Sequence, residues 1–211
     1  MSLVKYNDRS IRNLTTAPAS VTSSPGALVH IKTLTASSSA NLSFVNGSSD
    51  VVLDSTYPIY VFKFINMHPA TDNVNFTVNF RDGGSAYDAT KTSTSFGAYH
   101  DEGDSAAAVG YETSFDLAQS TSAQILGIGG SIGNGNDESL SGTLKLFNPS
   151  STTFVKHYIS NIHFYNKDDY AINSFIGGYC NVTAAIDGVQ FAMSSGNIDA
   201  GTIELYGIKD A

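Results

Sequence analysis

Alternating apolar and polar positions run through most of the chain and predict β-strands. The strictest alternation covers residues 73–80, where valine and phenylalanine alternate with asparagine and threonine. A period of two places apolar side chains on one face of a strand and polar ones on the other. Residues 59–66 are aromatic or β-branched almost throughout, which is typical of a strand buried on both faces. No segment combines helix-favouring residues with a 3.6-residue period.

Other parts of the chain follow the same pattern between turns, and each is a candidate strand. The further predicted strands are residues 28–35, 41–45, 51–53, 109–115, 124–128, 140–146, 154–165, 173–179, 182–186, 189–193 and 202–208. The run Arg81-Asp-Gly-Gly-Ser85 is a strong turn signal. Strands at this spacing without helical crossovers predict an all-β fold, an antiparallel two-sheet sandwich of jelly-roll type, with residues 26–211 as one domain.

The last two predicted strands lie on either side of a loop of glycine, asparagine and aspartate. Residues 189–193 and 202–208 both alternate apolar with polar positions. Two alternating runs around such a loop predict strands that pair with each other. Only three residues follow Ile208, so we expect the domain to finish inside its own sheet.

The first 25 residues differ from the rest and predict an extended N-terminal attachment arm. They are rich in serine and threonine, and three of the chain's 11 basic residues fall within the first twelve positions. Such a segment is too short and polar to bury a core by itself. We expect it to pack either on its own domain or on a partner chain. The residues predicted to make the attachment are Leu3, Val4, Lys5, Tyr6, Arg9, Ile11, Arg12 and Leu14.

Charge and composition narrow the range of partners. The net charge is −8, and the basic residues outside the arm are scattered, which argues against nucleic acid or an anionic membrane as partner. The single cysteine, Cys180, has no partner for an internal disulfide, and we expect a buried structural thiol. No apolar run approaches the ~18 residues of a membrane span, and no signal-peptide pattern opens the chain. We therefore expect the protein to fold in a cytosol.

The sequence contains no recognisable catalytic or metal-binding pattern, so we expect neither an enzyme nor a cofactor. The five histidines lack metal-ligand spacing, and no nucleophile elbow or phosphate loop is present. Asp101-Glu-Gly-Asp104 and the loop of residues 134–138 could supply oxygens to Ca²⁺, but neither has the spacing of a calcium loop. Exposed tyrosine and asparagine side chains could bind glycans, or they could lie at subunit interfaces. The histidines are His30, His68, His100, His157 and His163.

Four segments of the chain resemble a known family. Residues 194–208, Ser-Ser-Gly-Asn-Ile-Asp-Ala-Gly-Thr-Ile-Glu-Leu-Tyr-Gly-Ile, resemble the closing strands of jelly-roll virion proteins of tailed bacteriophages, notably marine ones. Asn66-Met-His-Pro-Ala-Thr-Asp72, Arg81-Asp-Gly-Gly-Ser-Ala-Tyr87 and Leu146-Phe-Asn-Pro-Ser-Ser-Thr152 support the resemblance. These motifs are structural turns, so they carry no active-site chemistry.

The resemblance implies a non-enzymatic structural protein of the virion, assembled in the host cytoplasm. Such a protein decorates the capsid or forms part of a head or tail fibre, contacts other virion proteins, and is often a homotrimer. The arm of residues 1–25 would then anchor the subunit. A second hypothesis is a tail-associated module for host attachment, which recognises a host-surface glycan.

Overall fold

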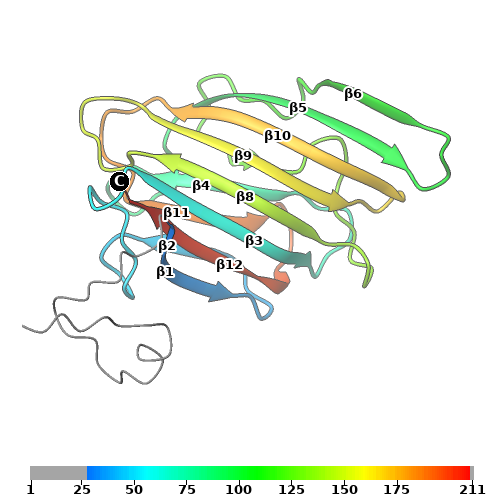
Figure 1. The fold of residues 1–211 in the computed structure, drawn as a ribbon, viewed down its shortest axis with the longest axis horizontal. Helices are drawn as coiled ribbons and strands as arrows, with labels where there is room; N and C mark the ends of the chain where they lie inside the picture. Colours follow the sequence, from blue (N-terminus) through cyan, green and yellow to red (C-terminus); the bar gives the residue numbers. More distant parts are fainter. Residues whose placement is uncertain (1–27, 210–211) are drawn as a thin grey trace, which may run out of the picture.

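The computed structural model describes residues 28–209, which form twelve β-strands in two sheets (Figure 1). In chain order the strands are β1 (Leu28–Thr35), β2 (Leu42–Val45), β3 (Ile59–Pro69), β4 (Phe76–Arg81), β5 (Lys91–Asp101), β6 (Ala107–Tyr111), β7 (Gln124–Ile125), β8 (Leu140–Phe147), β9 (Lys156–Tyr165), β10 (Tyr170–Cys180), β11 (Gly188–Met193) and β12 (Ile198–Ile208). Within this range no helix is long and apolar enough to cross a membrane.

Eight of the strands have the pairing of a jelly roll. Taken in chain order they are β1, β2, β3, β4, β7, β8, β11 and β12, and they pair first with last, second with seventh, third with sixth, and fourth with fifth. One sheet thus contains β1-β12-β3-β8, and the other contains β2-β11-β4-β7. The predicted antiparallel sandwich of jelly-roll type is confirmed.

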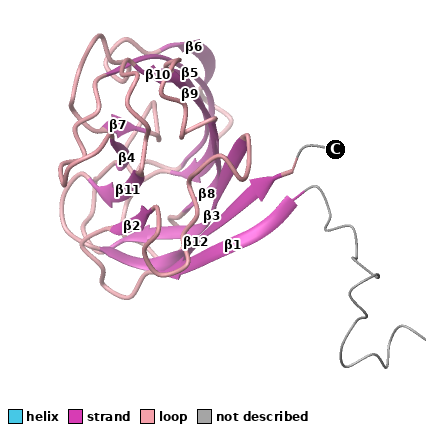
Figure 2. Ribbon diagram, turned by 90° about the vertical axis from the view of Figure 1, so that its left-hand side faces the viewer, coloured by secondary structure: helices cyan, strands magenta, loops and turns pink. Residues whose placement is uncertain are grey.

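The remaining four strands extend only one sheet. The hairpins β5–β6 and β9–β10 add to β8 in the order β9-β10-β5-β6, so the larger sheet has eight strands and the smaller sheet four. In Figure 2 the larger sheet is a curved layer with β6 at the top and β1 at the bottom, and the smaller sheet lies against its concave side. We call these two units the added hairpins.

Aromatic rings fill the space between the two jelly-roll sheets. Phe191 on β11 is fully buried, and its ring centroid lies between 5.1 and 6.3 Å from those of Phe44, Phe62, Phe64 and Phe76. These residues come from both sheets, so their side chains interlock across the sandwich. Edge-to-face and offset contacts at this distance add to the stabilisation that burial provides.

Three expectations about the strands were wrong. Residues 51–53 and 182–186 are not strands, although Val51 and Ile186 are buried; they fill the core from loops. The two last strands do not pair with each other, because β11 belongs to the smaller sheet and β12 to the larger one. The connection between them crosses from one sheet to the other, and alternation cannot distinguish such a crossing from a hairpin.

Candidate functional site

The predicted attachment residues lie outside the described part of the chain. All eight, from Leu3 to Leu14, precede residue 28, so the attachment arm stays a prediction. The other residues that the sequence singled out are described, and most of them have structural roles.

Two histidines contact the acidic loops, but only in pairs: His100 Nε2 lies 3.1 Å from Asp104 Oδ1, and His68 Nε2 lies 3.0 Å from the Gly135 carbonyl oxygen. His157 and His163 point outward from β9, where both are exposed, and residues 28–209 contain no group of three metal-ligating side chains. The Asp101 carboxylate accepts hydrogen bonds from the backbone N–H groups of Ser105 and Ala106 at 2.8 and 2.7 Å. The side-chain bond from Ser105 and these backbone bonds lower the pKa of Asp101. This carboxylate therefore stabilises the β5–β6 turn.

Cys180 lies in a buried row with two lysines. In the larger sheet it is directly opposite Lys91 on one side and Lys156 on the other, and all three side chains are fully buried. Burial raises the pKa of the thiol to about 12, against the opposing effect of the two ammonium groups. The expected buried thiol is confirmed. Its two buried lysine neighbours were not predicted.

Each buried lysine donates hydrogen bonds to uncharged oxygens. The Lys91 Nζ donates to Asn79 Oδ1 and to the carbonyl oxygen of Ala89, both at 2.8 Å. The Lys156 Nζ lies within hydrogen-bond distance of four backbone carbonyl oxygens, those of Ser151, Phe154, Val182 and Ala184, which share its three N–H groups. Burial lowers the pKa of both ammonium groups. Lys156 thereby joins two loops at one end of the added hairpins.

The opposite part of the added hairpins exposes apolar side chains. Tyr111, Phe96 and Phe175 are directly opposite one another on three adjacent strands. The two phenylalanine rings stack with their centroids 5.0 Å apart, and 46% of Phe96 is exposed. We call these three residues the aromatic ladder. Every residue of the neighbouring edge strand β6 is exposed, including Val109 at 76%.

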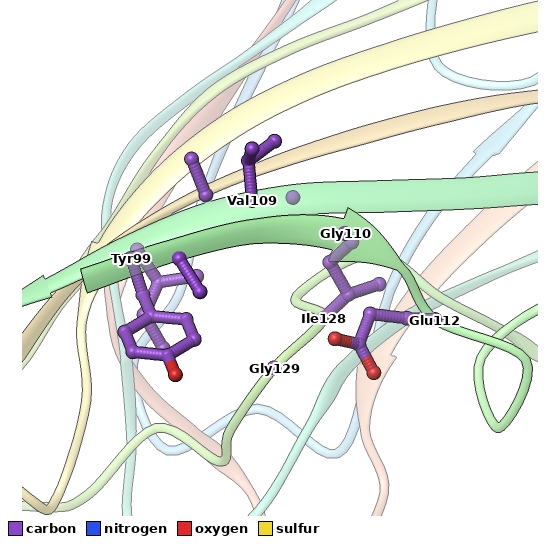
Figure 3. Close-up of a pocket in the computed structure, with 10 residues that line it drawn as sticks. Tyr99, Val109, Gly110, Glu112, Ile128 and Gly129 are labelled. Carbon is purple, nitrogen blue, oxygen red and sulfur yellow. The ribbon is translucent and has the colours of Figure 1, made fainter. Parts of the chain in front are cut away.

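A cavity of about 190 Å³ lies on the inner side of the same hairpin. Gly97 and Gly110, which are opposite each other on β5 and β6, leave room for it over the inner face of the strands, and Ile128 forms part of its apolar wall. Figure 3 shows Tyr99 and Glu112 projecting to the same side of the strands, so a phenol and a carboxylate face this space together. A carboxylate beside an aromatic ring in a small cavity suits a cationic side chain or a hydroxyl-rich group.

A shallow depression opens on the outer face at the other end of β5 and β10. Thr92, Thr94, His157 and Tyr179 surround Gly177, which has no side chain to fill the space. The rings of His157 and Tyr179 have centroids 6.0 Å apart. Hydroxyl groups and an aromatic ring around an open floor can bind a saccharide by hydrogen bonding and stacking.

The sequence did not predict β5, the strand on which these surfaces depend. Its 11 residues, Lys-Thr-Ser-Thr-Ser-Phe-Gly-Ala-Tyr-His-Asp, contain few large apolar side chains. The inward positions are Ser93, Ser95 and Gly97 rather than aliphatic residues. The β-favouring threonines and the aromatic residues Phe96 and Tyr99 were the available signal.

Comparisons of the chain with protein-family models, with curated proteins and with solved structures found no match.

Proposed function

We propose that this protein is a structural subunit of a bacteriophage virion, either a capsid-decorating protein or part of a head or tail fibre. The observation that carries the proposal is the exposed edge of the larger sheet, where an uncharged strand and the aromatic ladder are open to solvent. Apolar surface next to a strand with one unpaired edge is covered in an assembled particle. The jelly-roll sandwich and the resemblance of its turns to those of phage virion proteins agree with this role.

In this proposal residues 1–25 anchor the subunit, and several copies, a trimer in our proposal, associate with other virion proteins. The separation of an extended arm from a folded domain suits such an assembly, because the arm adds contact area while the domain stays outside. The subunit has no catalytic role in the particle.

Deleting residues 1–25 tests this proposal. The chain would be produced in cells that also make phage particles of its source, and the particles would be purified on a density gradient. The full chain should sediment with the particles, whereas the deletion variant should stay at the top of the gradient while keeping the β-sheet circular dichroism of the intact chain. A full-length chain that never sediments with particles would contradict the virion role, and a deletion variant that does so would contradict anchoring by the arm.

A second function, recognition of a host-surface glycan, is favoured by the depression around Gly177. Its threonine hydroxyls and the Tyr179 ring provide hydrogen bonding and stacking on one exposed face. Binding of the purified chain to a glycan array, abolished by Tyr179→Ala and kept by Tyr179→Phe, would support this function. An array without reproducible binding would leave the structural role as the only proposal.

A further inference from the structure

Strand β6 directs a set of backbone groups away from the sheet. At the ends of its ladder with β5, the Glu112 N–H donates to the Ser95 carbonyl oxygen at 2.9 Å, and the Asp101 N–H donates to the Ala106 carbonyl oxygen at 3.0 Å. Antiparallel pairing alternates, so every second residue of β6 bonds to β5 and the residues between face the other way. The N–H and C=O groups of Ala107, Val109 and Tyr111 therefore point to the free edge.

The edge strand itself carries no charged side chain, proline or bulge that would oppose strand addition. Sheet edges are commonly protected by charged side chains, prolines or bulges. The sequence of β6 is Ala-Ala-Val-Gly-Tyr, and its register with β5 is unbroken. At the other edge of the sheet, β1 carries Lys32 and has a register shift between His30 and Lys32. The β6 edge is thus the one suited to accept a strand.

The surroundings of the edge are acidic. Residues 92–120 contain five carboxylates and no lysine or arginine. One of these carboxylates, on Glu112, faces the cavity beside Gly110, which is where an added strand would place an inward-pointing side chain. A basic side chain on that strand would meet both Glu112 and the Tyr99 ring.

The chain itself contains a segment of complementary charge. Residues 1–27 carry Lys5, Arg9 and Arg12 against the single acidic residue Asp8. This segment precedes β1, which lies seven strand spacings from β6, or about 34 Å at ~4.8 Å per spacing. Residues 15–27 can span at most about 45 Å. Reaching its own β6 would stretch this linker to about three quarters of its full length even along a straight line, whereas the β6 of a neighbouring copy can lie closer.

We propose that the β6 edge binds residues 3–14 of a neighbouring copy as an added strand, with a basic side chain of that segment against Glu112. The proposal rests on the proposed function and names the partner of the arm. The added strand would form backbone hydrogen bonds with Ala107, Val109 and Tyr111. It would also cover the Tyr111 end of the aromatic ladder. Because each copy gives one arm and accepts another, the contacts run head to tail and can close into a ring such as a trimer.

The oligomeric state of the purified full-length chain, measured by sedimentation, tests whether the β6 edge binds another copy. Val109→Pro removes an outward N–H and leaves the bonds between β5 and β6 intact, while the matched control Val109→Thr keeps that N–H. We expect the original chain and Val109→Thr to form the same oligomer and Val109→Pro to associate at least about tenfold more weakly, a difference of about 1.4 kcal/mol. Glu112→Gln should weaken association less and reduce its dependence on salt. An oligomer unchanged by Val109→Pro, or a full chain that is monomeric at its highest soluble concentration, would overturn the proposal.

Disulfide capture identifies the segment that binds. Copies carrying Val109→Cys are mixed with copies carrying Tyr6→Cys under mild oxidation, and Cys180 does not interfere because it is fully buried. Covalent heterodimers on a non-reducing gel are expected. A link that forms only within one chain carrying both substitutions would overturn the neighbouring-copy arrangement, and no link at all would overturn the choice of segment. Particle sedimentation remains a separate measurement, so a failed edge test with intact particle binding leaves the proposed function in place.

Discussion

The jelly-roll part of the molecule and the added hairpins have interiors of different character. Between the jelly-roll sheets, Phe191 and its four aromatic neighbours make an apolar core. Of nine buried polar or charged side chains among residues 28–209, only Thr77 and Gln124 lie outside the added hairpins. The other seven are Lys91, Ser93, Ser95, Lys156, Ser160, Asn166 and Ser174.

The difference indicates that buried hydrogen bonds matter more in the added hairpins than in the jelly roll. Apolar packing is non-directional and stabilises both parts, since Tyr158, Phe164 and Ile176 of the added hairpins belong to the same core as Phe191. The added hairpins have buried hydrogen bonds as well, such as those from Ser95 Oγ to the Glu112 carbonyl oxygen at 2.7 Å and from the Ile128 N–H to Ser174 Oγ at 2.9 Å. Directional bonds fix the position of each strand. The hairpins can then expose apolar side chains on their outer face without relying on them for stability.

The largest effect is expected at the centre of the jelly-roll core. Phe191→Ala removes a fully buried ring that touches four others, and we expect it to lower the free energy of unfolding by about 3 to 5 kcal/mol. Urea denaturation followed by circular dichroism measures the change. A loss below about 1 kcal/mol would mean that the core collapses around the missing ring and is less closely packed than the contacts indicate.

A smaller but substantial effect is expected at the buried lysine of the added hairpins. Lys156→Met keeps most of the side-chain volume and removes the ammonium group from four carbonyl oxygens. Unpaired buried acceptors are costly, so we expect the free energy of unfolding to fall by about 2 to 3 kcal/mol. Hydrogen exchange of the 182–184 and 151–154 loops should rise as well. Increased stability would show that the cost of burying the charge exceeds the stabilisation that the lost hydrogen bonds provide.

The same difference explains how much of the fold the sequence could predict. Strands that face the apolar core, such as β4 and β11, were predicted because their alternation of apolar and polar residues follows burial directly. The strand β5 was missed because serine and glycine fill its inward positions, and their burial depends on partners far away in the sequence. Ser95, for example, bonds to Glu112. The pairing of β11 and β12 was predicted wrongly because alternation says nothing about which sheet a strand joins.

The candidate site was even less accessible from sequence. The cavity beside Glu112 requires Ile128 from a distant loop, and the aromatic ladder requires the register between β5 and β10. Residue types alone could suggest exposed tyrosines but not which three rings align. The buried row of Lys91, Cys180 and Lys156 likewise exists only because three strands bring these residues to the same level.

A pH-dependent effect is expected from the thiol in that row. The folded pKa of Cys180, about 12, exceeds its ordinary value of 9.0, so the stabilisation is fully present below pH 9 and is lost as the pH rises towards 12. Between pH 8 and pH 10 we expect a loss on the order of 1 kcal/mol from this group. The lowered pKa values of Lys91 and Lys156 act in the opposite direction up to about pH 10.5. The measurement is therefore the difference in unfolding free energy between the original chain and Cys180→Ala at each pH. A difference that stays constant from pH 8 to pH 10 would contradict a raised thiol pKa.

The smallest effect on stability is expected in the aromatic ladder. Phe175→Thr removes one ring of a stacked pair on the outer face, where Phe96 is already half exposed. Threonine favours strands, so we expect the free energy of unfolding to fall by no more than about 1 kcal/mol. A loss comparable to that of Phe191→Ala would mean that the hairpins depend on their outer face, and the contrast between the two parts would fail. Association is the second measurement. If a neighbouring copy covers the aromatic ladder, Phe175→Thr should reduce the free energy of association by more than it reduces the free energy of unfolding.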